Sequence, residues 1–138
     1  MVLVNKISCV IKMALEPTPE AASTMDGQSR ICNWVYNHLL NEAINLRTQF
    51  IQTGDSDNAK TVYTERGLRN LLPKIKKEKP FLNVVHSSPL KNTALRLSGV
   101  IQAHQKSKKG KRKGKTVGWP KFRSWQQSWF SLFYDEPN

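Results

Sequence analysis

The chain has few cysteines and no long hydrophobic run. Among its 138 residues only Cys9 and Cys32 are cysteines, and no Cys-x-x-Cys pair of a zinc ribbon is present. Thiols this sparse are typical of a reducing compartment, where they stay free. The apolar stretch 1–15 is interrupted by one asparagine and two lysines, so it is neither a signal peptide nor a membrane span. We therefore expect a cytosolic protein without a membrane partner.

Side chains suited to catalysis are also scarce. The ten acidic residues fall mostly in expected loops or at helix starts, which disfavours the paired carboxylates of a two-metal nuclease. His38, His86 and His104 are far apart in sequence, and Cys32 precedes His38 by six residues, a poor spacing for two metal ligands on a helix. We expect no active site, no metal and no cofactor in this chain.

Acidic residues are rarest where basic ones are densest. Residues 1–58 carry four basic and six acidic side chains, whereas residues 59–138 carry eighteen basic and four acidic ones, and the net charge is +12. This asymmetry favours a polyanionic partner, most often nucleic acid. Seven of the ten residues 106–115 are Lys or Arg and none is apolar, unlike a membrane-binding helix, whose basic face backs onto a hydrophobic one. A solvated linker is the other interpretation of such a run.

Two segments have the alternating pattern of a β-strand. Residues 6–15 alternate and are rich in β-branched side chains, and the prolines of residues 16–20 end that pattern. Residues 128–134 alternate again, with four aromatic side chains. Two lone strands do not form a stable sheet. We therefore expect that the chain is the beginning of a larger fold, or that its strands pair with a partner.

Between these segments the periodicity is helical. Apolar residues recur every three or four positions over residues 20–50, which predicts one long helix. Residues 53–60 are turn formers and predict a loop. A second helix is expected from Thr64, with a kink at Pro73. A third begins at Pro89, with the preceding serine as its N-cap.

Basic residues interleaved with aromatic ones form the candidate binding surface. Neutralising phosphates with Lys and Arg releases counterions, and aromatic rings beside cations suit stacking on unpaired bases. Aromatic residues more often belong to a core, but Trp119 is the one we expect to be exposed. The candidate nucleic-acid-binding residues are Lys106, Lys108, Lys109, Lys111, Arg112, Lys113, Lys115, Trp119, Lys121, Arg123, Arg66, Arg69, Lys76 and Lys77.

Four segments in order carry a family resemblance. They are "NKISCVIKMALEPTPE", "RICNWVYNHLLNEAI", "KPFLNVVHSSPLKNTALRL" and "GKTVGWPKFRSWQQSWFSLFY". Together they resemble the N-terminal part of the TnpB/OrfB transposon-encoded proteins, relatives of the type V CRISPR nucleases. Gly118, Pro120, Phe122 and Arg123 match that family's Gly-x-Pro-x-Phe-Lys/Arg segment. Residues 128–134 stand where the family has the strand that ends in Ser-Phe-x-x-x-Tyr.

The resemblance implies an α+β fold, a three-helix bundle inserted between strands of an incomplete, wedge-type β-barrel. The expected boundaries are 1–16 for the first strand, 17–105 for the helical recognition part, 106–117 for a basic hinge and 118–138 for the returning strand. In the family such a module holds guide RNA and the guide–target duplex. It is also described as the helix-turn-helix DNA-binding domain of a transposase.

The resemblance also implies where the family's catalytic residues lie. The family's RuvC carboxylates and zinc finger come downstream of the matching region, so this chain is expected to bind nucleic acid without a nuclease site of its own. That nuclease part is a further expected partner. Structured RNA is the first expected partner and DNA the second.

Two other functions fit the same residues. A free-standing DNA-binding regulator or transposase accessory would read bases with Lys91, Asn92 and Arg96 on the third helix. A structural or interaction protein would dock through its aromatic strand, and we would expect it to oligomerise and to respond little to nucleic acid.

Overall fold

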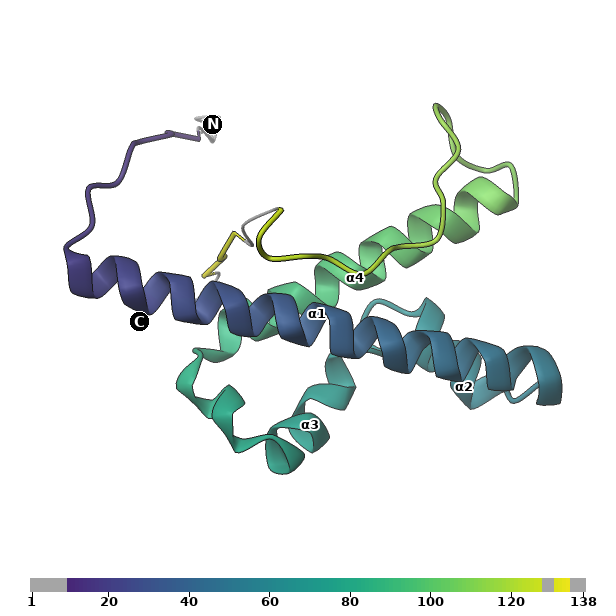
Figure 1. Ribbon diagram of the computed structural model, residues 1–138. Helices are drawn as coiled ribbons and strands as arrows, with labels where there is room; N and C mark the ends of the chain where they lie inside the picture. Colours follow the sequence, from purple (N-terminus) through teal and green to yellow (C-terminus); the bar gives the residue numbers. More distant parts are fainter. Residues whose placement is uncertain (1–9, 128–130, 135–138) are drawn as a thin grey trace, which may run out of the picture.

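A computed structural model describes residues 10–127 and 131–134 (Figure 1). Within these residues the chain has four α-helices, two short 3-10 segments and no strand. The helices are α1 (Pro19–Thr53), α2 (Ser56–Tyr63), α3 (Leu72–Glu78) and α4 (Ser87–Lys108), and the 3-10 segments are η1 (Arg69–Leu71) and η2 (Pro80–Val84).

The α+β prediction, with its incomplete β-barrel, is wrong for the described part of the chain, which is all-α. Residues 10–16, 118–127 and 131–134 are described and form no strand, while residues 1–9, 128–130 and 135–138 of the predicted strand segments lie outside the described residues. The alternating side chains of 10–15 stay exposed, Val10 and Ile11 by 90% and 76%. A period of two indicates a strand only when a neighbouring strand and a covering layer are available to pair with it.

The long helix predicted over residues 20–50 is confirmed as α1. Thr18 begins it by accepting a hydrogen bond from the Ala21 N–H at 3.2 Å, with Pro19 in the first turn. Gly54 ends it in the left-handed conformation at φ 73° and donates its N–H to the Phe50 carbonyl. Its buried stripe is made of Cys32, Val35, Tyr36, Leu39, Leu40 and Ala43.

The loop predicted at residues 53–60 is largely helix α2 instead. Asp55 accepts a hydrogen bond from the Asp57 N–H at 2.9 Å and so caps this helix, and the fully buried Val62 anchors it to the core. Asp and Ser favour helix N-caps as strongly as turns, which is why the composition alone pointed to a loop. Likewise Pro73 lies in the first turn of α3 and starts that helix rather than kinking one that begins at Thr64.

Helix α4 follows the third prediction closely. It begins at Ser87, and His86 rather than Ser88 is its cap, with His86 Nδ1 accepting from the Ser88 N–H at 3.1 Å. Its apolar stripe, formed by Leu90, Ala94, Leu97 and Ile101, is buried in full and packs against α1 in one continuous core. Leu39 of α1 and Leu97 of α4 are both completely inaccessible to solvent. After α4 the chain reverses and runs back along α1 and α4 as an extended segment without regular secondary structure (Figure 1).

Two glycines give a matched test of this packing. A Cβ built on Gly67 would overlap the backbone carbonyl of Thr61, whereas one on Gly27, inside α1, would meet nothing within 4 Å. We expect Gly67→Ala to lower the free energy of unfolding by about 1–3 kcal/mol and Gly27→Ala to raise it by about 0.5–1 kcal/mol. Urea denaturation followed by circular dichroism measures both. Equal effects of the two substitutions would contradict the close approach of Gly67 to Thr61.

Cys32 makes the free energy of unfolding depend on pH in the alkaline range. Burial raises the pKa of its thiol above the ordinary value of 9.0, although a hydrogen bond with Thr93 and the charge of Arg96 act in the opposite direction. The Cys32 thiol therefore ionises at a lower pH in the unfolded chain than in the folded one. Its contribution to the free energy of unfolding should be constant below about pH 9 and fall as the pH rises above it. We expect Cys32→Ala to reduce that fall, measured by urea denaturation from pH 7 to 10 under reducing conditions. Parallel pH profiles for the two proteins would show that Cys32 does not contribute to it.

Candidate nucleic-acid interface

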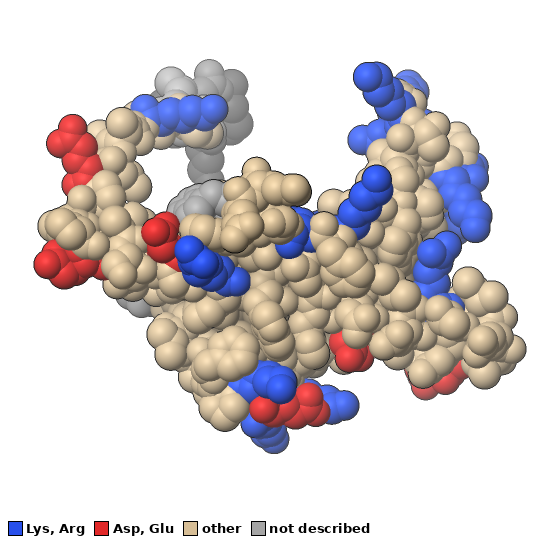
Figure 2. All heavy atoms as spheres, in the orientation of Figure 1, with Lys and Arg blue, Asp and Glu red and all other residues tan. Residues whose placement is uncertain are grey.

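The densest positive charge lies at the carboxyl end of α4. Lys106 and Lys108 occupy its last turn, and residues 109–115, hereafter the basic loop, follow it with five cations in seven residues. All of these basic side chains are exposed. Figure 2 shows them as blue side chains around the loop at the upper right, with no acidic side chain beside them on this face. In the sequence, residues 79–134 contain no Asp or Glu at all.

The basic loop is a defined turn. Gly110 and Gly114 adopt positive φ angles of 70° and 100°, a conformation that side-chain-bearing residues rarely take. The Arg112 guanidinium donates to the Lys115 carbonyl at 3.1 Å, and the Lys111 N–H donates to the Lys106 carbonyl at 2.9 Å. The loop therefore turns back on the end of α4.

The base of the loop is fastened to α4. The Val117 N–H donates to Ser107 Oγ at 3.0 Å, and the Val117 carbonyl lies 2.9 Å from His104 Nδ1. Because a carbonyl oxygen can only accept, His104 carries its proton on Nδ1 in this contact. The residues that the sequence assigned to a basic hinge are thus partly helix and partly a loop closed at its base.

Beyond the loop, a polar row on α1 holds the returning segment. Asn37 binds the Arg123 backbone on both sides: its Oδ1 accepts from the N–H and its Nδ2 donates to the carbonyl, each at 2.8 Å. Asn33 donates to the same carbonyl at 3.1 Å, and the Trp125 indole N–H donates to Ser29 Oγ at 2.9 Å. Ser29, Asn33 and Asn37 are spaced at i, i+4 and i+8, so they share one face of α1.

Trp119 is not the exposed aromatic residue, so the sequence prediction of its exposure was wrong. Its side chain is half-buried against the core. The Arg47 guanidinium covers its ring at 4.4 Å from the centroid, and His104 contacts it edge to face at 5.6 Å. Stacking of a base on the same face of Trp119 would have to displace Arg47.

Phe122 is the exposed aromatic residue of the part of this segment that follows the basic loop, residues 116–127. Its side chain is 58% accessible, and it lies between the exposed Lys121 and the half-buried Arg123. The Arg123 guanidinium lies over the Tyr36 ring, 5.6 Å from the centroid. Lys121 and Phe122 therefore extend the surface of the basic loop, whereas Arg123 also serves to hold the segment on α1.

The other predicted cations form a second group. Arg66 precedes η1, Arg69 lies in η1, and Lys76 and Lys77 lie on α3. These elements are near the amino end of α4, while the basic loop follows its carboxyl end. Since α4 has 22 residues, it separates the two groups by about 33 Å. The structure does not bring them into one patch.

The residues expected to read bases from α4 are half-buried. This holds for Lys91, Asn92 and Arg96. Arg96 Nη1 donates to the Ser131 carbonyl at 3.0 Å. Burial lowers the pKa of Arg96, and the nearby charge of Arg123 lowers it further. Major-groove reading by α4 would require this side chain to leave its carbonyl partner.

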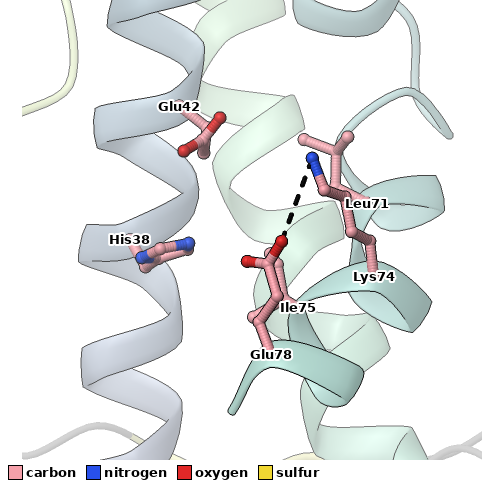
Figure 3. A pocket seen from close by; sticks show the side chains of 6 residues that line it. All are labelled: His38, Glu42, Leu71, Lys74, Ile75 and Glu78. Atoms are coloured by element: carbon pink, nitrogen blue, oxygen red, sulfur yellow. Dashed lines mark ion pairs between the residues drawn. The ribbon is translucent and has the colours of Figure 1, made fainter.

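A small pocket between α1 and α3 gathers the best candidates for acid–base chemistry (Figure 3). His38 and Glu42 extend from α1 toward Lys74 and Glu78 of α3, whose side chains form an ion pair at 4.0 Å. His38, isolated in the sequence, thus has carboxylates near it. The pocket holds about 50 Å³, room for a few water molecules only. No three His, Cys, Asp or Glu side chains among the described residues are placed to hold a metal ion.

Comparison of the chain with protein-family models, curated proteins and solved structures gave no match. The resemblance to the TnpB/OrfB proteins therefore stays a prediction that rests on the quoted motifs. Among the described helices, none combines the length and the apolar character that crossing a bilayer requires.

Sequence reasoning missed the residues of α1 that organise this surface. Arg30 and Arg47 each cover a tryptophan, Arg30 with its guanidinium 3.8 Å from the centroid of Trp125. The i, i+4 spacing of Asn33 and Asn37 was the available signal, because two asparagines on the border of an apolar stripe suggest a backbone partner.

The Asn37 contact can be tested by truncation. Asn37→Ala removes the partner of the Arg123 N–H, and we expect faster hydrogen exchange of that amide and a loss of about 1–2 kcal/mol in the free energy of unfolding. Asn41→Ala, at an exposed position one turn further along α1, is the control. It should leave the exchange of the Arg123 amide unchanged and should not lower the free energy of unfolding, because alanine is the better helix former. Unchanged protection of the Arg123 amide in Asn37→Ala would contradict the contact.

Proposed function

We propose that this chain binds nucleic acid through the basic loop and the Lys121–Phe122 pair that follows it, with structured RNA as the preferred ligand and DNA as the second. The observation that supports this most strongly is the loop itself: five exposed cations in seven residues, within a stretch of 56 residues, 79–134, that contains no acidic residue. A field of one sign over such a length attracts polyanions.

The fastening of the loop favours binding. Ordering a flexible basic tail on a ligand costs conformational entropy for each side chain and backbone unit that is immobilised. Here the glycine turns, the Val117 hydrogen bonds and the Asn37 contact fix the backbone on both sides of the cations. Phosphate contacts then release counterions at a smaller entropic cost.

Phe122 favours RNA with unpaired bases over a regular duplex. An exposed aromatic ring next to a lysine is suited to stack on a base that has left its helix while the lysine contacts the adjoining phosphate. A continuous duplex offers no free base face to such a ring. Base stacking of this kind tolerates any sequence, so we expect recognition of RNA structure more than of base identity.

In biological terms, the proposal is a nucleic-acid-binding module of a TnpB-like, transposase-associated protein. It would contact guide RNA or target DNA and leave strand cleavage to a nuclease part that is not in this chain. The resemblance of the four quoted segments supports this role. The all-α fold removes the wedge barrel from the proposal but leaves the basic loop and its flanking segment in it.

An interaction protein is the second candidate, favoured by one observation. Met13 and Leu15, like Val10 and Ile11, are exposed by more than three quarters, and Phe133 and Tyr134 by about half. Large apolar side chains exposed together mark protein-binding surfaces. This function predicts self-association or a protein partner, and indifference to nucleic acid.

The proposed function predicts a steep salt dependence that the loop controls. We expect the logarithm of the affinity for structured RNA to fall linearly with the logarithm of salt concentration. The double substitution Lys111→Gln with Lys113→Gln should lower that slope by about 1.4–1.8, depending on whether the contacted phosphates lie in single strands or a duplex. Fluorescence anisotropy across a salt series, with structured RNA, single-stranded DNA and duplex DNA, measures it.

The control pair is Lys12→Gln with Lys60→Gln, both exposed and outside the loop. It removes the same charge, so equal slopes for the two double variants would show that only net charge matters and would contradict a loop-centred site. Sequence-dependent binding of duplex DNA would favour the regulator. Weak binding to all three ligands, with oligomers in sedimentation, would favour the interaction protein.

A further inference from the structure

A second cavity lies where η1, α3 and the amino end of α4 meet. Three basic side chains line it, Arg69 from η1, Lys76 from α3 and Lys91 from α4, together with Ser87, the first residue of α4. Leu72 and Pro73 complete its wall, and no carboxylate lines it. Its volume is about 210 Å³, more than ten times the ~10–15 Å³ that one water molecule needs.

The three lining cations differ from their neighbours in burial. Arg69, Lys76 and Lys91 are half-buried, whereas the nearby Lys74, Lys77 and Lys79 are exposed. Lys74 has a carboxylate partner in Glu78, while neither Arg69 nor Lys76 has an ion-pair partner among the described residues. Gathering like charges around one partly desolvated space is unfavourable unless an anion neutralises them.

The donors around the cavity suit a phosphate group. Arg offers a planar fork of N–H donors that matches two phosphate oxygens, and Lys offers a compact charge. The Ser87 hydroxyl adds a neutral donor. The cavity also lies at the amino end of the 22-residue helix α4, where the helix dipole is positive. A carboxylate has only two oxygens, so it would satisfy fewer of these donors.

We propose that this cavity is a phosphate-binding site that takes one phosphate of the nucleic-acid strand held by the basic loop. The choice of strand rests on the proposed function. The cavity and the loop lie at opposite ends of α4, about 33 Å apart. A DNA duplex rises about 3.4 Å per base pair along its axis, so roughly ten base pairs of DNA reach from one to the other. A paired region of RNA, which is A-form and rises less per base pair, needs a slightly longer helix to do so.

The first experiment tests the cavity without nucleic acid. The full chain is titrated with inorganic phosphate at constant ionic strength, with chloride as the compensating salt, and backbone amide shifts are followed by NMR. We expect saturable shifts at Ser87 and Lys76. Lys76→Gln should weaken phosphate binding about tenfold, and Arg69→Gln should do the same. Lys77→Gln is the matched control, because it removes the same charge from the adjacent, exposed position, and it should leave binding unchanged.

Shifts that do not saturate, or that Lys76→Gln and Lys77→Gln affect equally, would overturn the phosphate site. Circular dichroism of each variant excludes loss of the fold as the cause. Because Arg69, Lys76 and Lys77 are not part of the core, we expect all three variants to fold.

The second experiment identifies the source of the phosphate. Affinities of the same variants are measured for RNA hairpins that carry a 5′-phosphate or a 5′-hydroxyl end. If the 5′-phosphate raises affinity and Lys76→Gln removes that gain, the site takes a terminal phosphate. If both RNAs bind alike and Lys76→Gln alone lowers the salt slope by about 0.7–0.9, the site takes a backbone phosphate. RNA binding that Lys76→Gln leaves unchanged would overturn the link to the strand.

The two proposals fail in different ways. Saturable phosphate binding in a chain that ignores all nucleic acids would refute the proposed function and keep the cavity as a site for a free phosphate ester. RNA binding that depends on Lys111 and Lys113, without phosphate binding at Ser87, would keep the proposed function and refute the cavity site.

Discussion

Packing of α1 against α4 is the constraint on which the rest of the molecule depends. The buried stripe of α1 meets the stripe of α4 that runs from Leu90 to Ile101, and both are inaccessible to solvent over several turns. An isolated helix is marginal in water, so burial of these apolar faces supplies most of the stability of both helices. Helix α2 adds Val62 to the same core, and Leu68, the residue just before η1, adds its side chain as well.

The same helix pair organises the cationic surface. Because α1 and α4 are fixed relative to each other, their outer edges offer a continuous track of donors and acceptors to the returning segment. His104 and Ser107 of α4 hydrogen-bond the segment at Val117. Further along, Asn37 and Asn33 of α1 bind the backbone of Arg123, and Ser29 binds the Trp125 indole. The basic loop is consequently closed at both ends. Its cations therefore extend from a backbone that hydrogen bonds fix on both sides, although the loop itself has no regular secondary structure.

Charge is distributed along α4 in two places with different surroundings. At the carboxyl end the cations are exposed, an arrangement suited to attracting a polyanion over a distance and to many weak contacts. At the amino end three cations are half-buried around a cavity, an arrangement suited to one directed contact. A rigid helix of about 33 Å between them sets the spacing at which a ligand has to match both.

The sequence by itself determined the long helix, the buried stripe of α4 and the cationic run, because helical periodicity and charge density are local properties that survive in any environment. It did not determine that residues 10–16 and 131–134 lack a strand, because pairing depends on a neighbour and not on alternation. Nor did composition separate the cap of α2 from a turn, since Asp55 serves either. Only the tertiary structure decided that Trp119 lies under Arg47 while Phe122 is exposed, and that Arg69, Lys76 and Lys91, far apart in the chain, surround one cavity. Burial and convergence are properties of the packed chain, fixed by which helix faces meet.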